Sequence, residues 1–69
     1  MIKEGIIVLG HGSRREDAND EIREICKKLS TKNPAARYEA AFLEFGKPSL
    51  TSVIEDLVAE GFKKIVIMP

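Results

Sequence analysis

Gly5-Ile6-Ile7-Val8-Leu9-Gly10-His11-Gly12-Ser13-Arg14 is the stretch that decides the fold. Its apolar half is rich in β-branched residues and predicts a buried strand that stops at Gly10. The only histidine of the sequence follows, between two glycines that leave room for a ligand and permit positive φ angles. Ser13 is predicted to cap the next helix, whose first turn could then present free backbone N–H groups. An imidazole placed in this way can bind a metal, move a proton or hydrogen-bond a ligand.

The residues on either side predict two further strands and two helices. A first strand is expected over 2–9, and the amphipathic helix after the loop ends at Asn33-Pro34. A second strand over 37–45 leaves through a loop that carries Glu44, and a second helix begins at Ser49 or its neighbour. Gly61 stands where a helix-ending glycine is expected, and a third strand over 65–68 is expected to be buried on both faces. The apolar helix stripes are Ala18, Ile22, Ile25, Cys26 and Leu29 in the first helix, and Leu50, Val53, Ile54, Leu57 and Val58 in the second.

This order predicts an α/β fold, a three-layer βαβαβ arrangement with a parallel sheet, as one domain over residues 1–69. A strand order of 2-1-3 is expected from fold rules together with the family resemblance given below. In such sheets ligands bind beyond the carboxyl ends of the strands. His11 and Glu44 stand at these ends on consecutive strands. We therefore expect the two side chains to converge on one site.

Composition excludes several classes of protein. The 69 residues carry 11 Lys plus Arg and 11 Asp plus Glu, so the basic excess typical of a nucleic-acid binder is absent. No apolar run approaches the roughly 20 residues of a membrane span, and no signal-peptide pattern is present, so we expect no membrane partner and a cytoplasmic protein. Cys26 is the single cysteine, and its place on an apolar helix face favours a buried structural thiol over a reactive or metal-binding one.

The candidate functional residues each have a plainer alternative. His11 is a candidate metal ligand or general base, or a histidine hydrogen-bonded within the fold. Glu44 is a candidate second ligand or proton acceptor, or a solvated loop glutamate. Arg14 and Arg15 stand against the positive end of a helix dipole and hint at an anionic ligand, although solvated side chains explain them equally well. The loop is not a P-loop, and Gly10 replaces the arginine of the Arg-His-Gly motif of histidine phosphatases.

Several separated motifs, in order, resemble those of the CbiX family of sirohydrochlorin cobaltochelatases and ferrochelatases. The resemblance runs along essentially the whole chain. The matching residues are Val8-Leu9-Gly10-His11-Gly12-Ser13-Arg14, Asn19, Ala41-Phe42-Leu43-Glu44-Phe45, Pro48-Ser49-Leu50, Ala59-Glu60-Gly61 and Lys64-Ile65-Val66-Ile67-Met68-Pro69.

The resemblance implies a type II chelatase, an enzyme that inserts a divalent metal into a tetrapyrrole without ATP, in cobalamin or sirohaem synthesis. It implies Co²⁺ as the metal substrate, with Fe²⁺ or Ni²⁺ as alternatives, and no organic cofactor. His11 would be the catalytic residue and, with Glu44, a metal ligand. Gly12, Ser13 and Arg14 would contact the substrate, in a cleft with apolar walls.

This chain departs from the family in length. Family members continue past the position of Pro69, through a loop that carries a second active-site histidine. The chain therefore resembles an N-terminal half domain, and a homo-oligomer, such as a dimer, is expected to bury the edge strand over 65–68 or the helix faces beside it. Two other interpretations remain. One is a truncated, non-catalytic module that binds metal or tetrapyrrole, and the other is a flavodoxin-like domain with an anion site at Gly12-Ser13.

Overall fold

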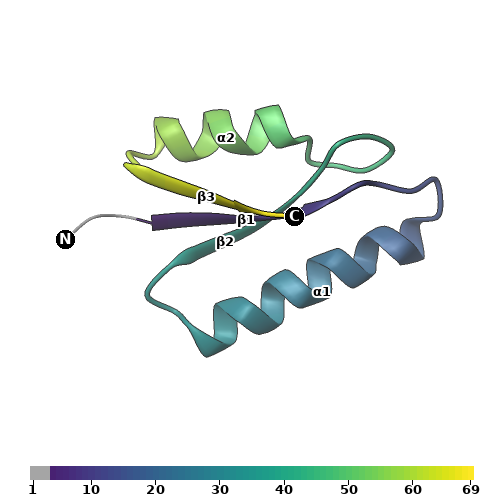
Figure 1. Ribbon diagram of the computed structural model, residues 1–69, viewed down its shortest axis with the longest axis horizontal. Helices are drawn as coiled ribbons and strands as arrows, with labels where there is room; N and C mark the ends of the chain where they lie inside the picture. The colour runs from purple at the N-terminus through teal and green to yellow at the C-terminus, as the bar shows by residue number, and fades with distance from the viewer. Residues whose placement is uncertain (1–3) are drawn as a thin grey trace.

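The computed structural model describes residues 4–69 as a three-stranded parallel sheet with one helix on each face (Figure 1). The strands lie in the order β2-β1-β3, and α1 and α2 cover opposite faces. The predicted three-layer α/β fold and its strand order are confirmed. The elements are β1 (Glu4–Gly10), α1 (Glu16–Lys32), β2 (Arg37–Phe42), α2 (Leu50–Ala59) and β3 (Lys64–Met68).

The central strand fixes where the loops go. β1 pairs with β2 from Gly5 opposite Arg37 to Gly10 opposite Phe42, and its other edge pairs with β3. Because both pairings are parallel, the carboxyl ends of β1 and β2 open at the same edge of the sheet. The loops 11–15 and 43–49 therefore lie side by side there.

The core forms because β1 is apolar on both faces, as a central parallel strand must be. Ile7 is fully buried against Ala41 of β2 and against Val53 and Leu57 of α2. Ile6 and Val8 point the other way, toward α1, where Cys26 is buried. Burial, with a smaller contribution from the charge of Glu39, raises the pKa of the Cys26 thiol. Cys26 is thus the structural thiol that the sequence predicts.

Two strand ends and the burial of one strand differ from the prediction. β1 runs to Gly10, while residues 2 and 3 of the predicted first strand lie outside the described residues. β2 stops at Phe42, not at residue 45, because the chain turns there and Phe45 takes a positive φ of 55°. The expectation that β3 is buried on both faces is wrong for this chain, since Val66, Ile67 and Met68 are 36–43% exposed. β3 is an outer strand, which explains this exposure.

The helices confirm most of the predicted pattern. Ser49 caps α2, its hydroxyl accepting a hydrogen bond from the Ser52 N–H, and Gly61 ends the helix with φ 89°. Ser13, however, does not cap α1, which begins at Glu16 with Arg15 in the cap position and no side-chain cap. Within the apolar stripes, Ile25 and Val58 are 47% and 60% exposed, so they lie at the margins of the core. In residues 4–69 neither helix has the length and apolar character needed to cross a membrane.

Leu57→Ala tests the core. Leu57 is fully buried, so we expect truncation to lower the free energy of unfolding by about 2–5 kcal/mol, measured by urea denaturation. Val58→Ala is the matched control on the same helix turn, because Val58 is exposed and should change stability by less than about 0.5 kcal/mol. Equal losses in the two variants would contradict this description of the core.

Candidate metal site at the carboxyl edge of the sheet

The backbone ladder between β1 and β2 continues past the strands and brings His11 to Glu44. The Leu43 N–H donates to the Gly10 carbonyl at 3.1 Å, and the Glu44 N–H donates to the His11 carbonyl at 3.2 Å. The two side chains then meet, with His11 Nε2 3.4 Å from Glu44 Oε1. The predicted convergence of these residues is confirmed.

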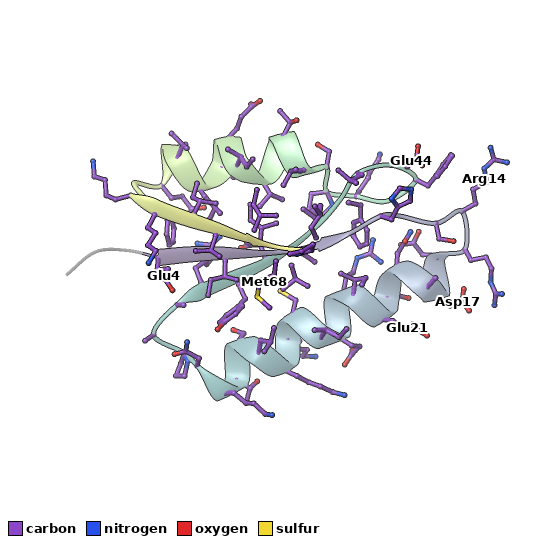
Figure 2. The ribbon with its side chains drawn as sticks, in the orientation of Figure 1. Glu4, Arg14, Asp17, Glu21, Glu44 and Met68 are labelled. Carbon is purple, nitrogen blue, oxygen red and sulfur yellow. The ribbon has the colours of Figure 1, made fainter. Side chains whose placement is uncertain are left out.

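The pair faces solvent. The His11 side chain is 79% exposed and the Glu44 side chain 54%, and Figure 2 shows Glu44 on the loop at one end of the molecule. Within residues 4–69, no group of three or more His, Cys, Asp or Glu side chains is arranged to hold a metal ion. An imidazole and a carboxylate at this separation can still bind one divalent ion together, with the remaining positions filled from outside the pair.

Gly12 permits the close approach of the two loops. Its φ is 98°, and a Cβ atom there would overlap the Glu44 carbonyl oxygen. A side chain would therefore meet the backbone of the neighbouring loop, in addition to the strain of a positive φ. Gly12 acts as a spacer that lets Glu44 approach His11, which the sequence showed only as room for a ligand.

Some of the backbone donors around Ser13 and the start of α1, considered above for an anion site, already have partners within the fold. The Ser13 N–H donates to Asn19 Oδ1 at 3.0 Å, and the Arg15 N–H donates to the Ser13 hydroxyl at 3.1 Å. Two of the backbone donors at this end of the helix are therefore already used. Glu16 and Asp17 also place negative charge in the first turn, where they would repel an anion.

The two arginines of the loop have different surroundings. Arg15 pairs with Asp17 at 2.9 Å on the exposed start of α1. The Arg14 guanidinium lies 4.9 Å from the centre of the Phe45 ring, and Figure 2 shows it at the same end of the molecule as Glu44. Phe45 itself is 52% exposed. Arg14 is thus a cation near the His11–Glu44 pair, and its guanidinium lies over an aromatic ring that is exposed to solvent.

Sequence reasoning did not single out the contacts that Asn19 and Arg23, one turn apart on α1, make with the loops. Asn19 is 2% exposed and bonds to both loops. Arg23 donates to the Lys47 carbonyl at 2.9 Å, and its hydrogen bonds with Glu16 and Asp20 raise its pKa. The available signal was a polar asparagine beside the apolar stripe of an amphipathic helix.

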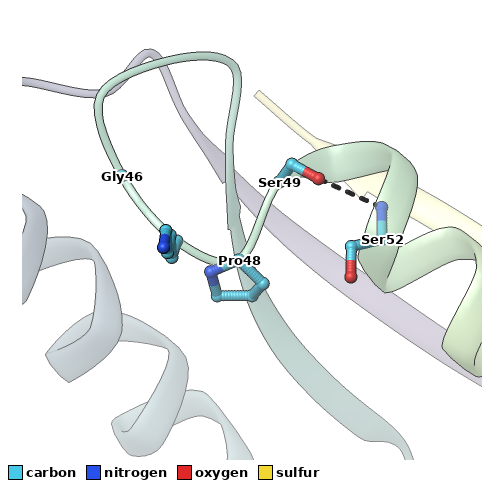
Figure 3. Close-up of a pocket in the computed structure, with 5 residues that line it drawn as sticks. Gly46, Pro48, Ser49 and Ser52 are labelled. Atoms are coloured by element: carbon cyan, nitrogen blue, oxygen red, sulfur yellow. Dashed lines mark hydrogen bonds between the residues drawn. The ribbon is translucent and has the colours of Figure 1, made fainter.

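A hollow of about 680 Å³ lies on the α2 side of loop 43–49 (Figure 3). Gly46, Lys47, Pro48, Ser49 and Ser52 line it, and the Ser52 N–H donates a hydrogen bond to the Ser49 hydroxyl there. Neither His11 nor Glu44 belongs to this lining. The hollow is therefore separate from the candidate metal site.

Known proteins share this sequence pattern. The model of the CbiX family matches residues 5–69, which include both His11 and Glu44. A sirohydrochlorin cobaltochelatase of Methanococcus aeolicus is 35% identical over 66 residues, which are 96% of this chain and 46% of that protein. A chloroplastic sirohydrochlorin ferrochelatase of Arabidopsis thaliana is 33% identical over 66 residues, 96% of this chain and 29% of its own length.

A third relative, a sirohydrochlorin cobaltochelatase of Methanococcoides burtonii, is 31% identical over 67 residues, 97% of this chain and 51% of its own length. The chain thus spans about half the length of the archaeal relatives that it matches. The names of these relatives include both cobalt and iron as the metal.

Gly12→Ala tests the spacing of the loops. Because the new methyl group would meet the Glu44 carbonyl, we expect the variant to separate His11 from Glu44 and to lose the nuclear Overhauser effect between the imidazole and the Glu44 side chain. Gly61→Ala is the matched control, since it has a similar positive φ but open space around it. Both variants should lose about 1–2 kcal/mol to backbone strain, and only Gly12→Ala should lose the contact. A preserved contact in Gly12→Ala would contradict the spacer role.

Proposed function

The chain belongs to the CbiX family, and we propose that it is a chelatase domain that inserts a divalent metal into sirohydrochlorin without ATP. The observation that carries this proposal is the 3.4 Å approach of His11 Nε2 to Glu44 Oε1 at the carboxyl edge of the sheet. We propose Co²⁺ as the metal, because the archaeal relatives above are named for cobalt. Fe²⁺ and Ni²⁺ suit the same two ligands.

The proposed chemistry follows from what the two side chains can do. Insertion of a divalent ion into the ring releases two pyrrole protons, so the site must present a metal and then accept protons. A neutral imidazole serves as ligand first and as base once the ion has moved to the ring. The Glu44 carboxylate offsets the charge of the ion while it is bound and accepts the second proton after the ion has moved to the ring. Exposure of both groups leaves the metal reachable from the side on which a planar ring would approach.

The remaining loop residues are proposed to contact the substrate. Gly12 presents bare backbone beside the pair, and the Ser13 hydroxyl can donate its proton while it accepts from the Arg15 N–H. The Arg14 guanidinium can pair with a carboxylate of sirohydrochlorin. Its position over the exposed Phe45 ring combines a cation with an apolar surface, which suits an anionic macrocycle.

A second candidate function is a non-catalytic module that binds metal or tetrapyrrole. The observation in its favour is that, in residues 4–69, His11 and Glu44 are not joined by a third potential ligand. Two exposed ligands hold a metal weakly, and general acid–base chemistry needs a defined geometry. Under this alternative the protein binds Co²⁺ or the ring without accelerating insertion.

We further propose that the chain self-associates through β3. This strand is an edge of the sheet, and its Val66, Ile67 and Met68 are exposed. An exposed apolar edge strand is a surface for pairing with another chain. A second copy seated there would cover the edge, and assembly is also a route by which a second polar group could join the site.

His11→Ala tests the chelatase proposal. We expect the protein to accelerate the absorbance change of sirohydrochlorin with Co²⁺ above a blank without protein, and the variant to lower kcat by about 10²-fold or more. The reason is that the variant removes both the metal ligand and the base. Glu44→Gln should reduce kcat less, because it keeps the shape of the side chain and loses only its charge.

Arg14→Ala is the binding control in the same assay. It should raise KM for sirohydrochlorin with kcat nearly unchanged, while Arg15→Ala should change neither, since Arg15 is paired with Asp17. Wild-type protein that binds Co²⁺ or the ring without turnover would replace the chelatase proposal with the non-catalytic module.

Self-association is tested by sedimentation velocity at micromolar concentrations. We expect the wild-type chain to form a dimer and Ile67→Lys to shift it toward monomer, because a charge on an edge strand opposes pairing. Val58→Lys is the matched control on an exposed apolar position of α2 and should leave the dimer intact. A monodisperse wild-type monomer would exclude association through β3.

A further inference from the structure

A single buried amide joins the two loops that carry the candidate metal site. Asn19 Oδ1 accepts from the Ser13 N–H at 3.0 Å, and Asn19 Nδ2 donates to the Ser13 carbonyl at 2.9 Å and to the Phe45 carbonyl at 3.2 Å. Ser13 lies two residues after His11, and Phe45 lies one residue after Glu44. The side chain is therefore bonded to both chain segments within two residues of the pair.

The pattern of donors and acceptors fits an asparagine better than an aspartate or a leucine. One oxygen faces an N–H, and one NH₂ group faces two carbonyls, so both ends of the amide are satisfied in only one orientation. An aspartate would set negative charge against two carbonyl oxygens, and a leucine would fill the space without any hydrogen bond. Gly46 leaves room for this arrangement, since a Cβ there would lie 3.2 Å from Asn19 Nδ2 and 2.8 Å from the Phe42 ring.

Helix stability does not explain this residue. Asn19 is the fourth residue of α1, and asparagine is a weaker helix former than most apolar residues. A position 2% exposed beside the apolar stripe would ordinarily hold an apolar side chain. A polar residue at a buried position that favours an apolar one, with all its hydrogen bonds satisfied, is typical of a side chain that supports a functional site. The backbone hydrogen bonds between the two loops extend as far as His11 and Glu44. The hydrogen bonds of Asn19 hold the residues that follow the pair, Ser13 and Phe45.

From this arrangement we infer that Asn19 is a positioning residue, which sets the separation of His11 and Glu44 by clamping loop 11–15 to loop 43–49. Its consequence for metal binding rests on the proposed function, but the clamp itself does not. Asn19 touches neither the imidazole nor the Glu44 carboxylate in the bonds above and acts only through the backbone of Ser13 and Phe45.

The test compares Asn19→Leu and Asn19→Asp with Asn33→Leu. Asn33 is the matched control, because it is an exposed asparagine at the far end of α1 that bonds to the Tyr38 hydroxyl. In metal-free protein, both Asn19 variants should lose the nuclear Overhauser effect between His11 and Glu44 and show about tenfold or more faster hydrogen exchange of the Glu44 amide. Exchange at the Ile7 and Ala41 amides of the core should stay slow in all variants.

A titration with Co²⁺ alone, followed through the imidazole signals of the single histidine, supplies the second readout. The Asn19 variants should bind Co²⁺ about tenfold or more weakly than wild type, and Asn33→Leu should match wild type. An intact contact between His11 and Glu44 in both Asn19 variants would overturn the inference. So would wild-type Co²⁺ affinity in variants that have lost the contact, or global unfolding of both variants, which would make the residue structural.

The same experiment separates this inference from the proposed function. If wild-type protein shows no Co²⁺ response at His11 while the Asn19 variants lose the contact, the chelatase proposal fails and the clamp stands. If wild type binds Co²⁺ and the variants keep both the contact and the affinity, the clamp fails and the chelatase proposal stands.

Discussion

The parallel pairing of β1 with β2 is the constraint on which the rest of the molecule depends. Its register sets Gly10 opposite Phe42, and two further backbone hydrogen bonds carry the ladder to His11 and Glu44. Ile7 and Ala41 of the same two strands form the centre of the core. The hydrophobic contacts that hold the sheet together therefore also fix which residues meet at its edge, because a slip by one residue would turn each side chain to the other face.

Local patterns were sufficient to predict the order of the elements and the meeting of His11 with Glu44. The apolar run of β1, the Asn33-Pro34 break and the Ser49 and Gly61 signals each act over a few residues and need no tertiary contact. The convergence of the pair then follows because both residues stand at the carboxyl ends of consecutive strands in a parallel sheet. These features were accessible because the physical cause of each lies in the sequence nearby or in a general rule of parallel sheets.

What the sequence did not reveal depends on contacts between distant residues. Serine is a residue type that commonly caps helices, but the Ser13 N–H donates to Asn19 and α1 begins only at Glu16. The close approach of Gly12 to the Glu44 carbonyl cannot be seen without both loops in place. The exposure of β3 likewise depends on what pairs with its outer edge, which a run of apolar residues does not specify. Tertiary context decided each of these points.

The exposure of the His11–Glu44 pair has a consequence for how long a metal would stay. Water surrounds both side chains, so their attraction for an ion is screened and most of the coordination shell of the ion would remain exchangeable. An ion held in this way would dissociate quickly. Such short residence would make the loop edge unsuitable for storing a metal, and well suited to handing one over to a stronger ligand.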